Sequence, residues 1–199
     1  MIKVLAIMGS PRRLKNNDRL LDELLKGLSG PHTIIEKYHA DHLNIQSCKA
    51  CDGCTRKKGC VLKDDMINLY AKFDEADIVI MTSPLYFNSV SAQLKSVIDR
   101  CQALWSSKYV LKDSMIDQTK KRLGYFLCTA GVPQNDSLFS AATPVMDLFF
   151  KSINADYLGN LFFCNVDEHP VYEDSEALTQ AFRTGENLLH IALSHRTAK

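Results

Sequence analysis

The sequence lacks two features that would direct it to a membrane or to a nucleic acid. Its apolar stretches, such as 78–81 and 157–164, fall well short of the roughly 20 residues that a membrane-spanning helix needs. Its 24 lysines and arginines are balanced by 23 aspartates and glutamates, which leaves a net charge of only +1. A protein without a basic excess has no general attraction for a polyanion. We therefore expect neither membrane nor nucleic-acid partners.

The N-terminus also lacks the pattern of a secretory signal, because its apolar run is short and ends at Gly9 and Pro11. We therefore expect a cytoplasmic protein. Against this background seven cysteines stand out, and four of them lie within thirteen residues. In a reducing compartment, clustered thiols indicate metal ligands or redox groups before they indicate disulfides.

Apolar runs and amphipathic stretches alternate along the chain. Strands are predicted at 3–8, 33–40, 76–82, 123–129 and 157–166, the second of them more polar and edge-like. Helices are predicted at 20–28, 66–73, 90–104, 138–153 and 178–193, with Asn16 or Asn17 as the N-cap of the first. This alternation predicts an α/β fold, a doubly wound five-stranded parallel sheet in a single domain over residues 1–199. Ligands of such sheets bind beyond the carboxyl ends of the strands.

The loop after the first predicted strand has the composition of an anion site. It reads Gly-Ser-Pro-Arg-Arg-Leu-Lys-Asn-Asn over residues 9–17 and runs into a helix. Backbone N–H groups at a helix N-terminus, the hydroxyl of Ser10 and the guanidinium of Arg12 suit a phosphate. The loop matches neither the Walker pattern nor the GxGxxG dinucleotide fingerprint. The alternative is a solvated basic turn that only connects strand and helix.

Two further strand-end loops indicate the flat part of a ligand. Residues 83–89 read Ser-Pro-Leu-Tyr-Phe-Asn-Ser and place two aromatic side chains directly after a buried strand. Aromatic rings and backbone amides suit a flat ring system, although a hydrophobic lid or a subunit contact would use the same residues. Residues 129–132 are small and include Gly131, which permits close approach to a ligand or a tight turn. Together the three loops predict a crevice with a phosphate end and a ring end.

The four clustered cysteines lie in an insertion at about residues 44–63, between the second strand and its helix. They are Cys48, Cys51, Cys54 and Cys60, in the pattern CxxCxxCx5C. Zinc sites generally use two CxxC pairs separated by a dozen or more residues. Consecutive CxxC spacings are typical of an iron–sulfur cubane held by one loop, and the longer last gap leaves slack for Cys60 to return to it. The spacing favours a cluster; zinc and metal-free thiols or disulfides are the alternatives.

These motifs together resemble a known protein family. Residues 9–12 followed by Asn17, and 83–86 followed by Ala92, Lys95 and 98–100, are similar to the flavodoxin-like NAD(P)H-dependent FMN reductase superfamily. The cysteine pattern followed by residues 64–66 resembles its iron–sulfur flavoprotein branch. The resemblance implies a flavodoxin-like sheet of order 2-1-3-4-5, bound FMN, a [4Fe–4S] cluster, and assembly as a homodimer or homotetramer.

Carried over by position, the resemblance implies roles for individual residues. The FMN phosphate would be held by Ser10, Arg12 and Asn17. The isoalloxazine would be lined by Pro84, Leu85, Tyr86, Phe87 and Asn88, and its polar edge would be approached by Thr129, Ala130 and Gly131. The cluster would be held by Cys48, Cys51, Cys54 and Cys60. The chain departs from the family pattern at Asp18, where relatives commonly have Thr or Ser, so we expect a carboxylate close to the phosphate.

The function expected from these features is electron transfer. A ferredoxin-like carrier or NAD(P)H would supply electrons, which would pass through the cluster and FMN to a small acceptor such as a quinone, oxygen or peroxide. The chemistry belongs to the cofactors, so no catalytic acid or base is expected in the chain. One alternative is an NAD(P)H-dependent FMN or quinone reductase without a cluster. The other is a non-enzymatic redox or metal sensor, in which the cysteine loop changes a binding surface.

Overall fold

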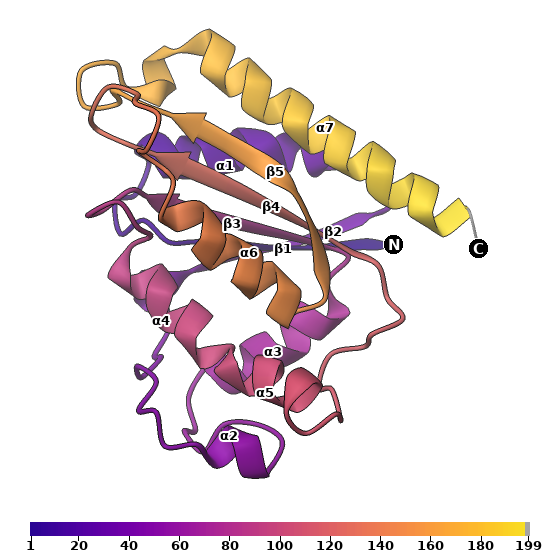
Figure 1. Ribbon diagram of the computed structural model, residues 1–199. Helices are drawn as coiled ribbons and strands as arrows, with labels where there is room; N and C mark the ends of the chain where they lie inside the picture. The colour runs from indigo at the N-terminus through magenta and orange to yellow at the C-terminus, as the bar shows by residue number, and fades with distance from the viewer. Residues whose placement is uncertain (198–199) are drawn as a thin grey trace.

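The computed structural model describes residues 1–197 and places a five-stranded sheet at their centre (Figure 1). In spatial order its strands are β2 (Thr33–His39), β1 (Ile2–Met8), β3 (Ile78–Pro84), β4 (Arg122–Thr129) and β5 (Ala155–Phe163). All four neighbouring pairs run parallel. The predicted α/β class and the strand order 2-1-3-4-5 are confirmed.

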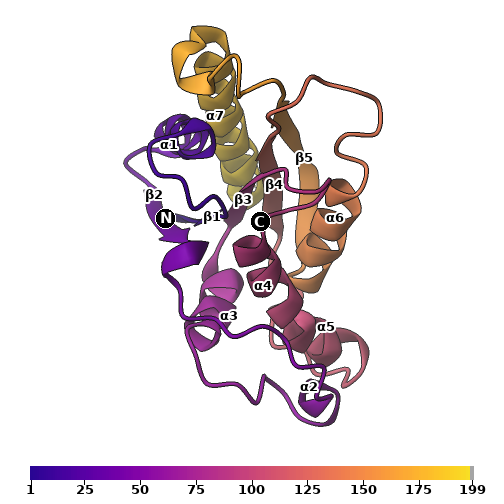
Figure 2. The same cartoon turned by 90° about the vertical axis from the view of Figure 1, so that its left-hand side faces the viewer.

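Helices cover both faces of the sheet (Figure 2). One face packs against α1 (Asn16–Leu28) and α7 (Ser175–Thr197). The other packs against α3 (Met66–Glu75), α4 (Ala92–Arg100), α5 (Gln102–Tyr109) and α6 (Ala142–Ser152). Every residue of β3 is buried, because apolar side chains meet a helical layer on each side. Within residues 1–197 no helix is long and apolar enough to cross a membrane.

The structure corrects three local predictions. The stretch 90–104 forms two helices rather than one, because α4 ends at Arg100 and a new helix begins at Gln102. The helix expected at 138–153 begins only at Ala142, after a turn. The N-cap of α1 is Lys15, which makes no side-chain capping bond. The two asparagines expected to cap this helix lie inside it, and their amides bond to other parts of the chain.

The insertion at 44–63, called here the cysteine segment, lies between the short helix η1 (Ala40–His42) and α3. It contains the one-turn helix α2 (Gly53–Arg56) and extends past α5, away from the sheet (Figure 2). Its two ends come together: the N–H of Asp65 donates to the carbonyl of Asn44 at 3.2 Å, and the N–H of Asn44 donates to Asp65 Oδ2 at 2.8 Å. The two ends of the segment are therefore held side by side, and we call this junction the neck of the segment.

Candidate functional site

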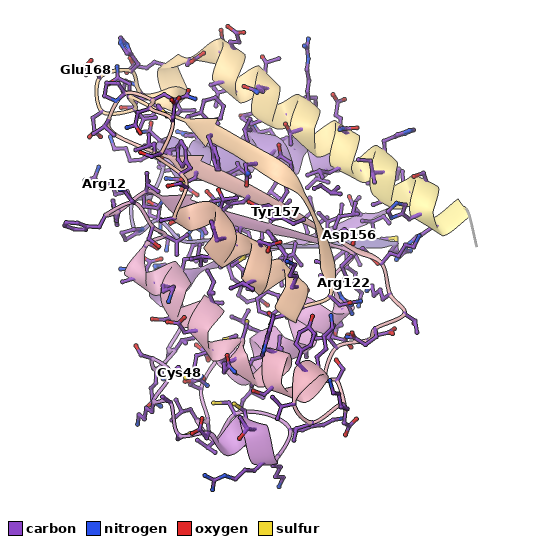
Figure 3. All side chains as sticks on the ribbon, viewed as in Figure 1. Arg12, Cys48, Arg122, Asp156, Tyr157 and Glu168 are labelled. Carbon is purple, nitrogen blue, oxygen red and sulfur yellow. The ribbon has the colours of Figure 1, made fainter. Side chains whose placement is uncertain are left out.

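A cavity of about 510 Å³ opens at the carboxyl ends of β1, β3 and β4. We call it the strand-end cavity. Figure 3 shows Arg12 at this end of the sheet. All eleven residues that sequence reasoning assigned to FMN line it: Ser10, Arg12, Asn17, Pro84, Leu85, Tyr86, Phe87, Asn88, Thr129, Ala130 and Gly131. The three loops meet there because parallel strands bring their carboxyl ends to one edge of the sheet.

One end of this cavity is built to receive an anion. The buried Ser10 accepts a hydrogen bond from the N–H of Arg12 at 3.2 Å, which curls the loop in front of α1. The first N–H groups of a helix have no partner within it, and at α1 no side chain caps them. Arg12 and Lys15 line the same end of the cavity. Positive side chains and free helical N–H groups together favour a phosphate.

Asp18 does not face this anion site, contrary to expectation. Its carboxylate accepts from Lys37 Nζ at 2.5 Å and from the N–H of Leu14 at 2.7 Å, and it does not line the cavity. Burial alone would raise the pKa of Asp18, but these hydrogen bonds outweigh burial and lower it. The negative charge of Asp18 is thus neutralised by Lys37 of β2.

Asn16 and Asn17 brace the walls of the cavity. Asn17 Nδ2 donates to Thr129 Oγ1 at 2.7 Å, and its Oδ1 accepts from Thr82 Oγ1 at 3.0 Å, so one amide joins β3 to β4. Asn16 Nδ2 donates to the carbonyl of Val166 at 3.2 Å, and its Oδ1 accepts from the N–H of Val171 at 3.0 Å. The start of α1 is therefore fixed by tertiary hydrogen bonds in place of a local cap.

The ring end of the cavity is a tight hairpin. Tyr86 and Ser89 exchange backbone hydrogen bonds of 2.9 and 3.0 Å, and the two residues between them, Phe87 and Asn88, have φ of 48° and 59°. This is the geometry of a type I′ turn. A left-handed conformation costs a phenylalanine about 1–2 kcal/mol, and its side chain is fully exposed. A strained and exposed aromatic at the mouth of a cavity is available to cover a flat ligand.

One wall of the cavity, which follows β5, was not predicted from the sequence. It consists of Val166, Asp167, Pro170 and Tyr172, and four further residues of the first and fourth strand-end loops also line the cavity: Lys15, Asn16, Val132 and Leu138. The loop after β4 pairs with this wall through hydrogen bonds from the N–H of Val166 to Ala130 and from the N–H of Asn165 to Val132. A Cβ at Gly131 would lie 2.1 Å from Asp167 Oδ2, so a larger residue there would displace the side chain of Asp167. The strand-end rule, applied to the fifth strand as well, would have found it.

The four clustered cysteines line a second, smaller recess of about 50 Å³, called here the cysteine recess. Cys54 and Cys60 are half-buried, whereas Cys48 and Cys51 are exposed. Figure 3 shows Cys48 well away from Arg12, and the two cavities share no lining residue. All four are free thiols, and among residues 1–197 no three His, Cys, Asp or Glu side chains are gathered closely enough to hold a metal ion.

A buried ion pair adjoins this recess. Arg100 and Asp64 have almost no exposed side-chain surface, and Arg100 Nη1 lies 2.6 Å from Asp64 Oδ2. Burial works against both charges, yet the pairing outweighs it, raising the pKa of Arg100 and lowering the pKa of Asp64. Both groups are therefore charged at neutral pH, and Arg100 is one of the residues that line the recess.

Residues 2–134, about two thirds of the chain, match the family model of the NADPH-dependent FMN reductases. The chain belongs to this family. The match covers the loops after β1, β3 and β4 and the cysteine segment, which are the parts that carried the resemblance.

Curated relatives within this group are iron–sulfur flavoproteins. One from Archaeoglobus fulgidus is 40% identical over 99 residues, which are 50% of this chain and 45% of the relative. One from Methanosarcina thermophila is 30% identical over 114 residues, 57% of this chain and 60% of the relative. The chain spans about half the length of the curated relatives it matches. The resemblance to the iron–sulfur flavoprotein branch is confirmed.

Solved structures show the same fold at low sequence identity. A flavone reductase superposes with a TM-score of 0.73 at 17% identity, over 100% of this chain and 65% of the other. The NAD(P)H:quinone oxidoreductase from Methanothermobacter marburgensis gives a TM-score of 0.71 at 20% identity, over 94% of this chain and 96% of the other. At these identities the likeness establishes the flavodoxin-like fold.

Proposed function

We propose that this protein is an FMN-dependent oxidoreductase that also carries a [4Fe–4S] cluster and transfers electrons to a small acceptor. One observation carries the proposal: the residues assigned to FMN from the sequence line a single cavity at the strand ends. Membership of the FMN reductase family supports the same cofactor. When bound, FMN exchanges one or two electrons and a cluster exchanges one, so the cofactors supply the redox chemistry and the chain supplies their sites.

The strand-end cavity fits FMN in the chemistry of its lining. Ser10, Arg12 and the first turn of α1 would bind the phosphate, with Lys15 as a second cation. Asn17 would contribute its backbone N–H while its amide keeps β3 and β4 in register. The segments 84–88 and 129–131 would enclose the isoalloxazine between the hairpin and the loop after β4. Exclusion of water by this hairpin would be the main contribution of Phe87.

The cysteine recess fits a thiolate-bound group in its donor set. It offers four free thiols from one short segment, and Arg100 supplies a positive charge beside them. We propose that Cys48, Cys51, Cys54 and Cys60 hold the cluster. The left-handed residues Ala50 and Asp52 turn the chain between the thiols.

The remaining partners follow from this assignment. The electron donor would be a ferredoxin-like carrier or NAD(P)H, and the acceptor a small molecule able to reach the mouth of the strand-end cavity. We propose a homodimer or homotetramer of single-domain chains. Free thiols on the surface suit the reducing cytoplasm.

The proposal is tested by cofactor analysis of protein purified without oxygen. We expect a flavin absorption spectrum together with iron and acid-labile sulfide in equal amounts. Cys54→Ser should lose iron and keep flavin. Cys164→Ser is the matched control, because Cys164 is also half-buried but lies outside the recess. Flavin without iron in the wild-type protein would refute the cluster, and retained iron in Cys54→Ser would refute the four-cysteine assignment.

A second candidate is an NADPH-dependent flavin or quinone reductase without a cluster. One observation favours this candidate: among the described residues, the thiols of residues 48–60 do not lie close enough together to bind a metal ion. In that case iron-free protein should have its flavin bleached rapidly by NADPH alone. The cluster-bearing form should instead require a protein electron donor for rapid reduction.

A further inference from the structure

Arg100, the last residue of α4, is a buried arginine placed between the sheet and the cysteine segment. Its side chain has 0% exposure, and that of Asp64 has 1%. Nη1 donates to Asp64 Oδ2 at 2.6 Å and Nη2 donates to Asp64 Oδ1 at 3.1 Å. This two-bond geometry is specific to a guanidinium, since an ammonium group cannot reproduce it. The remaining Nε is buried without a hydrogen-bond partner among the described residues.

The same ion pair fastens both arms of the cysteine segment. Arg100 Nη1 also donates to the carbonyl of Gln46 at 2.8 Å, and Nη2 lies 3.5 Å from the carbonyl of Leu62. Asp64 Oδ2 accepts from the N–H of Gln46 at 3.0 Å. Gln46 precedes the first clustered cysteine by two residues, and Leu62 follows the last by two. The pair thus closes the neck of the segment that carries all four thiols.

The positive member of the ion pair is the one that adjoins the thiols. Arg100 lines the cysteine recess, whereas Asp64 does not. A second polar group reaches the thiols from α5: Ser106 is fully buried, and its Oγ accepts a hydrogen bond from the Cys54 thiol at 3.6 Å. Gln102 Nε2 donates to the same oxygen at 3.2 Å, so the hydroxyl hydrogen can turn to the sulfur once Cys54 has lost its proton.

We propose that Arg100 and Ser106 are positioning residues for the group that the four cysteines hold, an inference that rests on the cluster proposed above. Arg100 closes the neck and places a buried positive charge beside the recess, and the hydroxyl of Ser106 donates a hydrogen bond to Cys54 when that cysteine is a thiolate. Thiolates around a cluster carry net negative charge, which increases by one on reduction. A buried cation and a hydrogen-bond donor stabilise the more negative state, so both residues raise the reduction potential.

The hydroxyl is tested by Ser106→Ala, with Ser107→Ala as the matched control. Ser107 is buried on the same helix, but its hydroxyl bonds to Leu104 and Met115 instead of a cysteine. In a redox titration of the cluster followed by electron paramagnetic resonance, Ser106→Ala should lower the equilibrium constant for reduction several-fold at unchanged iron content. Ser107→Ala should leave it unchanged. Equal potentials in the two variants would overturn the role of Ser106.

The positive charge is tested by Arg100→Gln, with Arg122→Gln as the control for loss of a buried arginine. Arg122 is also fully buried, but it pairs with Asp74 at 2.6 Å and lies outside the recess. Arg100→Gln should lower the reduction constant at least tenfold, which is about 59 mV for one electron, and Arg100→Lys, which keeps the charge, should restore part of it. Iron-loaded Arg100→Gln with a wild-type potential would overturn the electrostatic role while leaving the cluster assignment intact.

A measurement on metal-free protein separates this inference from the proposed function. Opening the neck should make Cys54 and Cys60 react at least tenfold faster with an alkylating reagent in Arg100→Gln, but not in Arg122→Gln, as followed by mass spectrometry. If wild-type protein never binds iron, the cluster assignment and the electrostatic role both fail, and alkylation still decides whether Arg100 closes the neck. Unchanged alkylation in Arg100→Gln would overturn that role.

Discussion

The carboxylate of Asp18 is buried close to the proposed anion site, yet it pairs with Lys37 instead of facing that site. Lys37, on the edge strand β2, bonds to Asp18 at 2.5 Å and to Asp22 at 2.6 Å. The lysine therefore ties α1 to the sheet and neutralises the acid on the side away from the cavity. The positive end of α1 and the basic loop before it stay available to a phosphate.

This arrangement predicts a pH-dependent cost for Asp18→Asn. The pKa of Asp18 is lower in the folded protein than its ordinary value of 3.8, since bonds from Lys37 and Leu14 outweigh burial. The stabilisation is therefore complete above pH 3.8 and is lost as pH falls through the lower folded pKa. At pH 7 the variant should lose about 1.5–3 kcal/mol of unfolding free energy.

Urea unfolding of the two proteins at pH 7 and near pH 3 measures this effect. The difference between wild type and Asp18→Asn should shrink at the lower pH. Asp156→Asn is the control, because Asp156 is exposed on β5 and should give a small difference at both pH values. A difference that stays constant between the two pH values would contradict the role assigned to Lys37.

In the hairpin at 86–89, Phe87 is both strained and exposed. We expect this residue to lower the stability of the fold and to strengthen FMN binding. Phe87→Gly should raise the unfolding free energy by about 1 kcal/mol, since glycine adopts a positive φ without steric cost. The same change should weaken FMN binding, because the aromatic cover is lost. Both effects are measurable, the first by denaturant unfolding and the second by fluorescence titration of FMN.

Leu14→Gly is the matched control for this prediction. Leu14 is also exposed with a positive φ, of 55°, but it does not line the strand-end cavity. It should gain similar stability without loss of FMN affinity. If Phe87→Gly bound FMN as tightly as the wild type, the hairpin would not be the ring-covering element.

The elements that could be predicted from the sequence are those whose signal is local. Apolar runs such as 78–82 located the central strands, and the end of each located a loop that lines the cavity. The break between α4 and α5 could not be predicted, because the apolar spacing continues through Cys101, where the N–H bonds to both Val97 and Ile98. Asn16 and Asn17 misled the cap prediction because their partners are more than sixty residues away.

The residues of the candidate site that could be predicted are also those with a local pattern. Its glycine, hydroxyl and aromatic residues follow strands, and spacing alone grouped the four cysteines. The wall formed by Asp167 and Tyr172 carries no such pattern, since it is placed by backbone pairing with the loop after β4. The contacts of Arg100 with Gln46, Leu62 and Asp64 could not be predicted either, because 36 to 54 residues separate the arginine from these partners.

At the scale of the whole molecule, the strand-end cavity and the cysteine recess are distinct and share no lining residue. We therefore expect the two sites to be separable. Replacing residues 47–61 by two glycines keeps Gln46, Leu62 and the Arg100–Asp64 pair. The replacement removes the hydrogen bond between Cys54 and Ser106, the exposed Lys58–Asp113 ion pair and the packing of the half-buried Cys54 and Cys60 against the core. Exposed ion pairs contribute little to stability.

The shortened protein should fold, bind FMN with wild-type affinity and contain no iron. Circular dichroism, FMN titration and iron analysis measure the three outcomes. The four-cysteine variant with every clustered cysteine changed to serine is the control, because it removes the thiols without shortening the chain. Loss of FMN binding in the shortened protein alone would show that the segment supports the strand-end cavity.

The closed neck also bears on how such a chain can diverge. Because both arms end at one guanidinium, the distance that the segment must span does not depend on its length. Doubling the number of residues in a flexible loop costs only about 0.6 kcal/mol of chain entropy. The length of this segment can therefore change during evolution at little cost to the stability of the flavodoxin-like sheet.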